Sequence, residues 1–425
     1  MLSKGDWMSI KAQVEAGVYR VFRKCARQVT QPGSMGPCGT MKNEVQYPWR
    51  DDTMERASDT GSTRPIFEPK SQKAMFYLCC KRLSFNLCKW IGLFRLARRM
   101  TRNGLRILCY HGFSMIDESR FSPRTFIEPG TFKKRMLFIR HKGFPVLSLE
   151  EALKAFDNGT LPPNAVVITI DDGFFSTYKL AWPILRELSM PAIVYVTTYY
   201  AIKQTPIFRL AVQYMFWKTT AQSLDTTGLG FSETGVIPVA TMEQKRSALL
   251  AAIRHGESQC NNEKREWLAN LLGERLGVDY RAIVNSRIFN VMSPEEIIDL
   301  ARGGIGIELH SHRHNLPLDH SGARREIEEN RVILERLTGS SLIHFCYPSG
   351  FYRLEQLPWL AESGIFSAVT GESGLNYPHT PKLRLKRFVD GEDVSFIEFE
   401  GEVMGFAELA RRVFAGIKGI AGQNG

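Results

Sequence analysis

The chain has 425 residues, of which 44% are hydrophobic, and its formal net charge is +11. This length suits one large domain or two ordinary ones, and the composition allows a sizeable core. The eight cysteines form no CxxC pair and are too sparse for a disulfide scaffold, which excludes a zinc ribbon and favours reduced, cytosolic thiols. Neither a signal peptide nor an apolar run of about 18 residues is found, so we expect a cytoplasmic protein without a spanning helix.

The first part of the chain differs from the rest. Residues 1–74 are rich in Gly, Pro, Ser and Thr, which predicts a disordered extension; the alternative is a native start near Met75. Residues 75–104 form a basic amphipathic segment, because no acid occurs between Glu68 and Asp117. This pattern predicts peripheral contact of residues 75–106 with an anionic membrane, the alternative being a helix packed on the domain. Nucleic acid is not expected, because no recognition motif accompanies the charge.

Strand-like and helix-like segments alternate from residue 105 onward. Strands are expected at 105–111, 165–170, 191–198, 305–309, 342–347 and 366–371. Capping boxes, Ser148 with Glu151 and Ser293 with Glu296, predict two helix starts. Residues 205–290 show no strand signal and read as a helical insertion. The alternation predicts an α/β fold with a parallel sheet, open or closed into a barrel, over residues 105–405, followed by a C-terminal helix and tail at 406–425.

Polar side chains stand where four of the expected strands end. Because carboxyl ends of parallel strands meet at one rim, we expect these groups to lie together. They are His111, Asp171, Asp172, His310, His312, His314, Tyr347 and Ser349.

The paired acids and the histidines have a metal-site spacing. Successive strand residues point to opposite sides, so Asp171 and Asp172 can face a substrate and a metal separately; alone, the pair could also be a turn or a helix N-cap. His310 and His314 would share one face of a helical turn, and two imidazoles with one carboxylate bind a catalytic metal. His312, between them, is expected to point elsewhere.

Three short motifs resemble those of polysaccharide deacetylases, the NodB-like enzymes of carbohydrate esterase family 4. They are Thr169–Gly173 (TIDDG), His310–His314 (HSHRH) and Cys346–Gly350 (CYPSG). The resemblance covers about residues 105–405 and implies a distorted (β/α)₇ barrel with a helical insertion. It also implies that Asp171 is the general base and that Asp172, His310 and His314 hold a divalent metal, most simply Zn²⁺.

Two positions depart from the usual pattern of that family. No late L-x-L-H motif occurs, but His111 in "CYH" resembles the general acid of the rearranged subtype with an early Y-H motif, found in bacterial poly-N-acetylglucosamine deacetylases. The arginine of the third motif is replaced by Cys346, so we predict that Arg387, or alternatively Arg384, orients the base. Tyr347, Ser349 and Gly173 are predicted substrate-binding residues, with the Ser349 N–H facing the oxyanion.

The resemblance therefore implies a metal-dependent hydrolase that removes an N-acetyl group from a sugar. Its substrate would be a polysaccharide or lipid-linked glycan in the biosynthesis of bacterial cell-surface polysaccharide or exopolysaccharide, met at the inner membrane face. Two alternatives remain at this point. One is a deformylase or cyclic-amide hydrolase of the same fold, and the other is an inactive carbohydrate-binding barrel.

Overall fold

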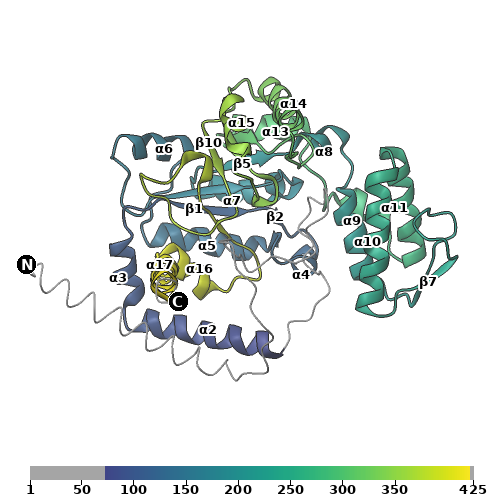
Figure 1. Cartoon of the computed structure of the whole chain (residues 1–425), viewed down its shortest axis with the longest axis horizontal. Coiled ribbons are helices and arrows are strands. Elements are labelled where there is room, and N and C mark those ends of the chain that lie inside the picture. The colour runs from purple at the N-terminus through teal and green to yellow at the C-terminus, as the bar shows by residue number, and fades with distance from the viewer. Residues whose placement is uncertain (1–71, 422–425) are drawn as a thin grey trace, which may run out of the picture.

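A sheet of seven parallel strands forms the centre of the structure, a computed structural model that describes residues 72–421 (Figure 1). The strands follow the order β10-β9-β8-β5-β4-β1-β11 in space, and each neighbouring pair is parallel. Their bounds are β1 Arg106–Tyr110, β4 Val166–Ile170, β5 Ile193–Val196, β8 Gly306–Leu309, β9 His344–Cys346, β10 Ser367–Val369 and β11 Phe388–Val389.

The two edges of this sheet are joined by one short segment, residues 385–389. At its start Leu385 pairs in parallel with Val369 of β10, and the Leu385 N–H donates to the Ala368 carbonyl at 2.9 Å. At its end β11 pairs in parallel with β1. The sheet thus closes on itself, and the predicted seven-stranded barrel is confirmed.

Alternation along the strands separates the barrel interior from its outer surface. On β4, Val167 belongs to a buried cluster with residues of five other strands or strand ends, whereas Val166, Ile168 and Ile170 pack beneath the helices. The inward row of β4 therefore runs from Val167 through Thr169 to Asp171, and on β1 the same row ends at His111. The pleat alone directs both polar groups to the carboxyl end of the barrel.

Helices cover the outside of the sheet. Both predicted capping boxes are confirmed, because Ser148 accepts from the Glu151 N–H and Ser293 from the Glu296 N–H, each with the reciprocal bond. The helices are α5 Pro129–His141, α6 Leu149–Asp157, α7 Trp182–Glu187 after the π-helical turn η1 Thr177–Ala181, α8 Thr198–Lys203, α13 Pro294–Arg302, α14 His320–Thr338 and α15 Gln356–Glu362. Shorter elements at the carboxyl end are β2 Gly112–Phe113, α4 Glu118–Phe121, β3 Phe126–Ile127, and the single turns η2 Pro348–Gly350 and η3 Lys382–Arg384.

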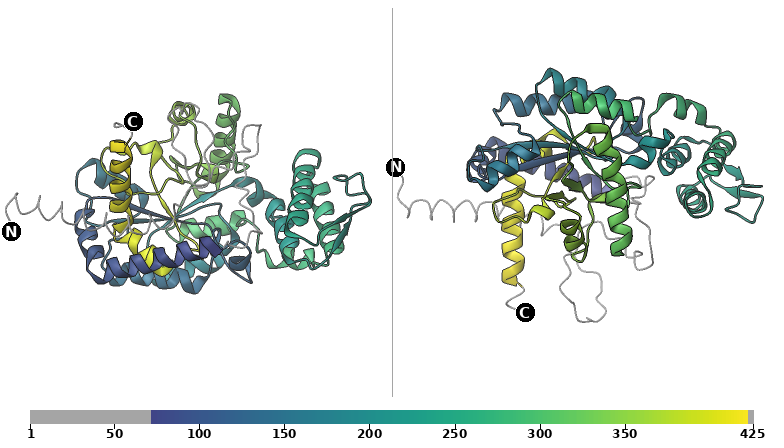
Figure 2. Two further views of the ribbon diagram at one scale, coloured as in Figure 1. Left: turned by 60° about the horizontal axis from the view of Figure 1, so that its bottom comes forward. Right: turned by 90° about the horizontal axis from the view of Figure 1, so that it is seen from above.

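The inserted segment projects from one side of the barrel in all views (Figures 1 and 2). It has its own apolar core, which includes Phe216, Leu249 and Leu272. Its elements are α9 Phe208–Lys218, β6 Ser223–Asp225, β7 Val236–Pro238, α10 Met242–Gln259, α11 Asn262–Leu276 and α12 Tyr280–Ser286. The prediction of no strand here is wrong, because β6 and β7 form an antiparallel hairpin. Three-residue strands with one buried side chain, Leu224, are too short for a period-two pattern to be recognised.

Two helical pairs from the chain ends pack together on the barrel. The N-terminal pair is α2 Gln72–Trp90 and α3 Leu93–Met100, separated by Gly92 with a φ of 84°. The C-terminal pair is α16 Phe396–Val403 and α17 Phe406–Ala421, and α2 runs along α16 in Figure 1. Among the described residues, no helix is both long and apolar enough to cross a membrane. The predicted extension, residues 1–74, lies almost wholly outside the described residues.

A buried carboxyl on β8 leads to a pH-dependent stability. The Glu308 carboxylate accepts from the His344 N–H at 2.9 Å, and burial raises its pKa to about 8. The folded chain therefore binds this proton more tightly than the unfolded chain, so its contribution to stability is present at low pH and is lost as the pH rises toward 8. We expect the unfolding free energy of the wild type to fall between pH 5 and pH 8 by on the order of 2–4 kcal/mol more than that of Glu308→Gln. Urea unfolding of both proteins over this range measures the difference, and parallel curves would contradict the assignment.

Candidate active site

Asp171 is the innermost polar group at the carboxyl end of the barrel. Arg387, just before β11, binds it through two hydrogen bonds of 2.7 and 2.8 Å, and both side chains are almost fully buried. Burial opposes the charge of Asp171, but the guanidinium outweighs burial and holds the pKa of this carboxyl well below its usual range. Asp171 is therefore ionised at neutral pH and available to accept a proton. Of the two arginines considered, the structure brings Arg387 to the acid, whereas Arg384 donates to the Tyr352 hydroxyl.

Two thiols complete the surroundings of Asp171. The Sγ atoms of Cys109 and Cys346 lie 3.4 and 3.3 Å from its Oδ2, and Arg387 Nη2 lies 3.3 Å from the Cys346 sulfur. Burial raises the pKa of both thiols, so they are uncharged donors rather than reactive thiolates. Cys346, which stands where the third motif usually has arginine, is thus a buried thiol. The role of Cys109 was missed, because a cysteine inside an apolar strand gives no signal of its neighbours.

Asp172 leaves the inward row of β4 through an unusual backbone conformation. Its φ is 68° and that of Gly173 is 73°, so two successive left-handed residues turn the chain out of the strand. A Cβ on Gly173 would meet Val196 Cγ1 at 3.0 Å in addition to this strain, which explains the glycine. The turn is what lets neighbouring acids serve two different positions.

His310 and His314 converge on Asp172, but not through a helical turn as predicted. Residues 310–314 form a loop in which Ser311 and His314 are left-handed, with φ values of 61° and 55°. The ring centroids of His310 and His314 are 4.8 Å apart. Their Nε2 atoms lie 3.1 and 3.2 Å from Asp172 Oδ1. The spacing of the motif was informative, whereas the helical reason given for it was wrong.

A second set of contacts fixes the orientation of His310. Its Nδ1–H donates to the Cys346 carbonyl at 2.8 Å, which leaves the Nε2 lone pair free to bind an ion. Its backbone N–H donates to Asn330 on α14, and the Asn330 amide in turn donates to the Val196 carbonyl. Asn330 gave no sequence signal, because a single asparagine on a helix is recognised only once the helix is placed. His312 points away, with Nδ1 2.8 Å from the Thr198 hydroxyl.

The three side chains Asp172, His310 and His314 fit a divalent metal ion. Two ligand atoms that bind one ion at about 2.1 Å and at tetrahedral or octahedral angles lie about 3.0–3.4 Å apart. The two distances from Asp172 Oδ1 fall within this range, and the three ligand atoms all lie within 4.8 Å of one another. A carboxylate and two neutral imidazoles suit a borderline metal such as zinc and leave coordination positions open.

His111 ends β1 beside the two acids. Its Nε2 lies 3.7 Å from Asp171 Oδ2, and its side chain is 25% exposed. Burial lowers the pKa of His111, against the attraction of Asp171 and Asp172. Its Nδ1 is buried without a hydrogen-bond partner among the described residues. The imidazole thus presents Nε2 to the Asp171 carboxylate.

Of the two predicted substrate-binding residues of the third motif, one is exposed and the other is buried. Ser349 is exposed and left-handed, with a φ of 58°, at the turn after β9. Tyr347 is fully buried, and its hydroxyl donates to the Leu383 carbonyl at 3.0 Å. The prediction that Tyr347 binds substrate is therefore wrong for its side chain. Its apolar ring follows the outward row of β9 into the core under the helices.

Comparisons with known proteins bear on this geometry. No protein-family model matches the chain. The poly-beta-1,6-N-acetyl-D-glucosamine N-deacetylase of Escherichia coli K12 is 28% identical over 92 residues, which are 21% of this chain and 13% of that protein. Among solved structures, the Streptococcus pyogenes deacetylase PplD in complex with acetate has a TM-score of 0.46 and 17% identity, over 71% of this chain and 98% of that one. IcaB from Ammonifex degensii has a TM-score of 0.45 and 17% identity, over 71% of this chain and 97% of that one.

The curated match is short and spans about one eighth of that relative's length. It nevertheless points to the same group of proteins as the three motifs, and those motifs surround the carboxyl end of a seven-stranded barrel. The resemblance of this chain to the NodB-like polysaccharide deacetylases is thereby confirmed.

Proposed function

We propose that the protein is a metal-dependent hydrolase that removes the acetyl group from an N-acetylated sugar in a polysaccharide or lipid-linked glycan. The observation that carries the proposal is the convergence of Asp172, His310 and His314 beside an acid, Asp171, that Arg387 keeps ionised. The similarity to the Escherichia coli N-deacetylase supports hydrolysis of the same bond and suggests a β-1,6-linked N-acetylglucosamine polymer as the substrate. Such a reaction belongs to the assembly of cell-surface polysaccharide.

Each polar group has one task in the proposed reaction. A zinc or similar ion bound by Asp172, His310 and His314 would act as a Lewis acid toward the acetyl carbonyl and toward water. Asp171 accepts one proton from the attacking water as the new C–O bond forms. The Ser349 N–H faces the carbonyl oxygen as its charge develops. His111 delivers a proton to the sugar nitrogen as the C–N bond breaks, so the products are acetate and a free amine.

Acetate release is the direct test of this proposal. Purified protein loaded with Zn²⁺ would be incubated with a β-1,6-linked N-acetylglucosamine oligomer, and both acetate and new primary amines would be counted. We expect the two products in equal amounts. Release of formate from N-formyl sugars, without acetate from the N-acetyl oligomer, would instead favour a deformylase.

We further propose a place of action, the inner face of the membrane, with α2 as the contact. One face of α2 packs inward. There the ring centroids of Phe85 and Phe406 are 5.3 Å apart, and Lys89 Nζ lies 2.6 Å from Glu400 Oε2. The opposite face carries a stripe at helical spacing that is 48–84% exposed: Phe76, Leu83, Leu87 and Trp90. Beside it, α3 and the turn after it expose Arg95, Arg99 and Arg102, which have no acidic partner among residues 72–421. An apolar stripe with cations favours an anionic lipid surface.

Vesicle binding tests this contact. The wild type should sediment with vesicles of phosphatidylglycerol and phosphatidylethanolamine but not with phosphatidylcholine alone. We expect the paired variant Leu83→Ser and Trp90→Ser to lose most of this binding. Trp267→Ser, on α11 with 54% exposure, is the matched control and should bind like the wild type. Equal binding by both variants would refute the contact, and a concentration-dependent dimer would assign the stripe to a second copy.

A further inference from the structure

An open cavity of about 630 Å³ lies between the barrel and the inserted segment. Four stretches of chain line it: two leave the strand ends that carry the candidate active site, a third belongs to the inserted segment, and the fourth is Glu128–Pro129 at the start of α5. Ser114–Ile116 begin three residues after His111, and Phe175 comes three residues after Asp172. Because consecutive Cα atoms are 3.8 Å apart, the Cα atoms at which these two walls begin lie within about 11 Å of the Cα atoms of His111 and Asp172. The third stretch, Asn285–Arg287, ends α12 of the inserted segment, and Figure 1 shows that segment beside α4 and α8.

Two residues make this part of the wall rigid. The Arg287 guanidinium lies 3.7 Å from the centroid of the Phe175 ring. It also forms two hydrogen bonds, of 2.6 and 2.8 Å, with the Glu296 carboxylate on α13. The inserted segment is thus attached to the chain that follows the two acids. This contact is one of several between the two parts, another being the hydrogen bond of 2.8 Å from the Phe175 N–H to the Asn290 carbonyl.

Ser114, Glu128 and Ser286 form hydrogen bonds within the protein, but two other polar groups of the wall do not. Lys179 and Asn285 are exposed, and within the described part of the chain neither forms a hydrogen bond or an ion pair; Lys179 lies only near the Phe175 ring, at 5.7 Å. Apolar side chains, Met115, Pro129 and Leu180, separate them. A sugar residue presents the same mixture, hydroxyl groups around its edge and C–H groups on its faces. The volume lies in the range of about 300–1,000 Å³ that is typical of ligand pockets.

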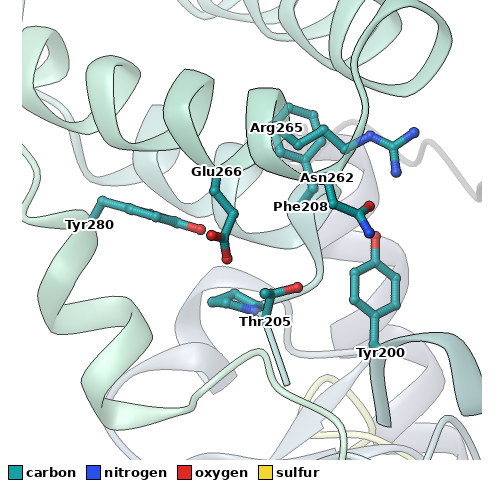
Figure 3. A pocket seen from close by; sticks show the side chains of 8 residues that line it. Tyr200, Thr205, Phe208, Asn262, Arg265, Glu266 and Tyr280 are labelled. Carbon is teal, nitrogen blue, oxygen red and sulfur yellow. The ribbon is translucent and has the colours of Figure 1, made fainter. Parts of the chain in front are cut away.

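The other cavity near the inserted segment does not compete for this role. It lies where α8 meets α11 and is lined by Tyr200, Asn262 and Glu266 among others (Figure 3). Its volume is about 20 Å³, little more than the roughly 10–15 Å³ that a single water requires.

We propose that the larger cavity binds the sugar residues next to the one being deacetylated, and that the inserted segment supplies one wall through Asn285 and Arg287. The proposal rests on the proposed deacetylase function, because it assigns the substrate as an oligomer rather than a single sugar. Lys179 and Asn285 donate hydrogen bonds to hydroxyl oxygens of the neighbouring residue. Affinity should therefore increase with chain length until the cavity is filled.

Calorimetric binding of a β-1,6-linked N-acetylglucosamine tetramer and of the monomer to the full-length protein tests the proposal. The paired variant Lys179→Ala and Asn285→Ala should bind the tetramer about tenfold more weakly, as expected for two lost hydrogen bonds, and should change monomer binding far less. The matched control is Lys154→Ala with Asn158→Ala, an exposed lysine and asparagine on α6 and at its C-terminal end. This control should bind the tetramer like the wild type.

Two results would overturn the proposal: a wild type that binds the tetramer no more tightly than the monomer, or a Lys179 and Asn285 variant that binds it undiminished. Acetate release is scored separately. A wild type that binds the tetramer through these residues but releases no acetate would refute the deacetylase function and leave the cavity assigned. Deacetylation at a rate that does not depend on chain length would support the deacetylase function and refute the assignment of the cavity.

Discussion

The variant Asp171→Asn should release acetate about 10³-fold more slowly than the wild type, because general-base catalysis by a positioned carboxylate is worth about 10²–10⁴. The amide keeps the size of the side chain but cannot accept the proton of the attacking water. Two hydrogen bonds from Arg387, of 2.7 and 2.8 Å, hold Asp171 in place, and the proposed metal ligands are Asp172, His310 and His314 instead. Metal content should therefore remain that of the wild type. Steady-state rates and metal analysis of the same preparation measure both quantities.

One side effect of this variant requires a control. The uncharged amide would leave the Arg387 guanidinium buried without its counter-charge, which costs about 3–5 kcal/mol in comparable buried pairs. Thermal melting should accordingly show a less stable protein, and rates must be compared at a temperature where both proteins are folded. A folded Asp171→Asn protein whose rate is within about tenfold of the wild type would rule out Asp171 as the base.

Removal of one imidazole should abolish metal binding. We expect about one equivalent of zinc in the wild type and less than about one tenth of an equivalent in His310→Ala. Residues that only hydrogen-bond to a metal ligand already contribute about 10–100-fold to metal affinity, so loss of the ligand itself should cost at least as much. His310 is the most constrained of the three groups, buried and held by the Cys346 carbonyl and Asn330. Acetate release should fall with the metal content. Inductively coupled plasma mass spectrometry, after dialysis against buffer that contains only a trace of zinc, gives the number of zinc ions per protein.

His312→Ala is the matched control for this experiment. It removes a histidine from the same loop, but its ring contacts Thr198 and Tyr199 rather than Asp172. Metal content and activity should stay close to those of the wild type. Loss of metal in His312→Ala but not in His310→Ala would mean that the ligand set is wrong. An absence of metal in the wild type, even after incubation with zinc, would refute the metal-dependent mechanism itself.

The sequence predicted those features that depend on neighbouring residues. Strand alternation and strand ends placed Asp171 and His111 at one rim, and capping boxes located the starts of α6 and α13. Arg387 was proposed because the third motif lacks the arginine that usually orients the base. The missing arginine indicated that another one, distant in the sequence, takes this role. That pairing joins residues 216 positions apart, and only a closed barrel brings them together.

Features that depend on tertiary packing were not predictable in this way. Asn330 reaches the His310 backbone from a helix that gives no sign of it in sequence. The left-handed residues Ser311 and His314 replace the predicted helical turn with a loop, and neither residue type announces that conformation in the sequence. The burial of Tyr347 follows from the placement of β9 against its helices. In each case a distant element decides the outcome.

The closure of the barrel by residues 385–389 also has a consequence for protein synthesis. These residues leave the ribosome 216 positions after Asp171, which at about 5–20 residues per second means roughly 10–40 s. During that interval β1 and β10 have no strand between them, and Asp171 lacks the two hydrogen bonds from Arg387 that orient it. We expect nascent chains that end before this segment to be inert toward glycans, so that hydrolytic activity first appears only after residues 385–389 have been synthesised.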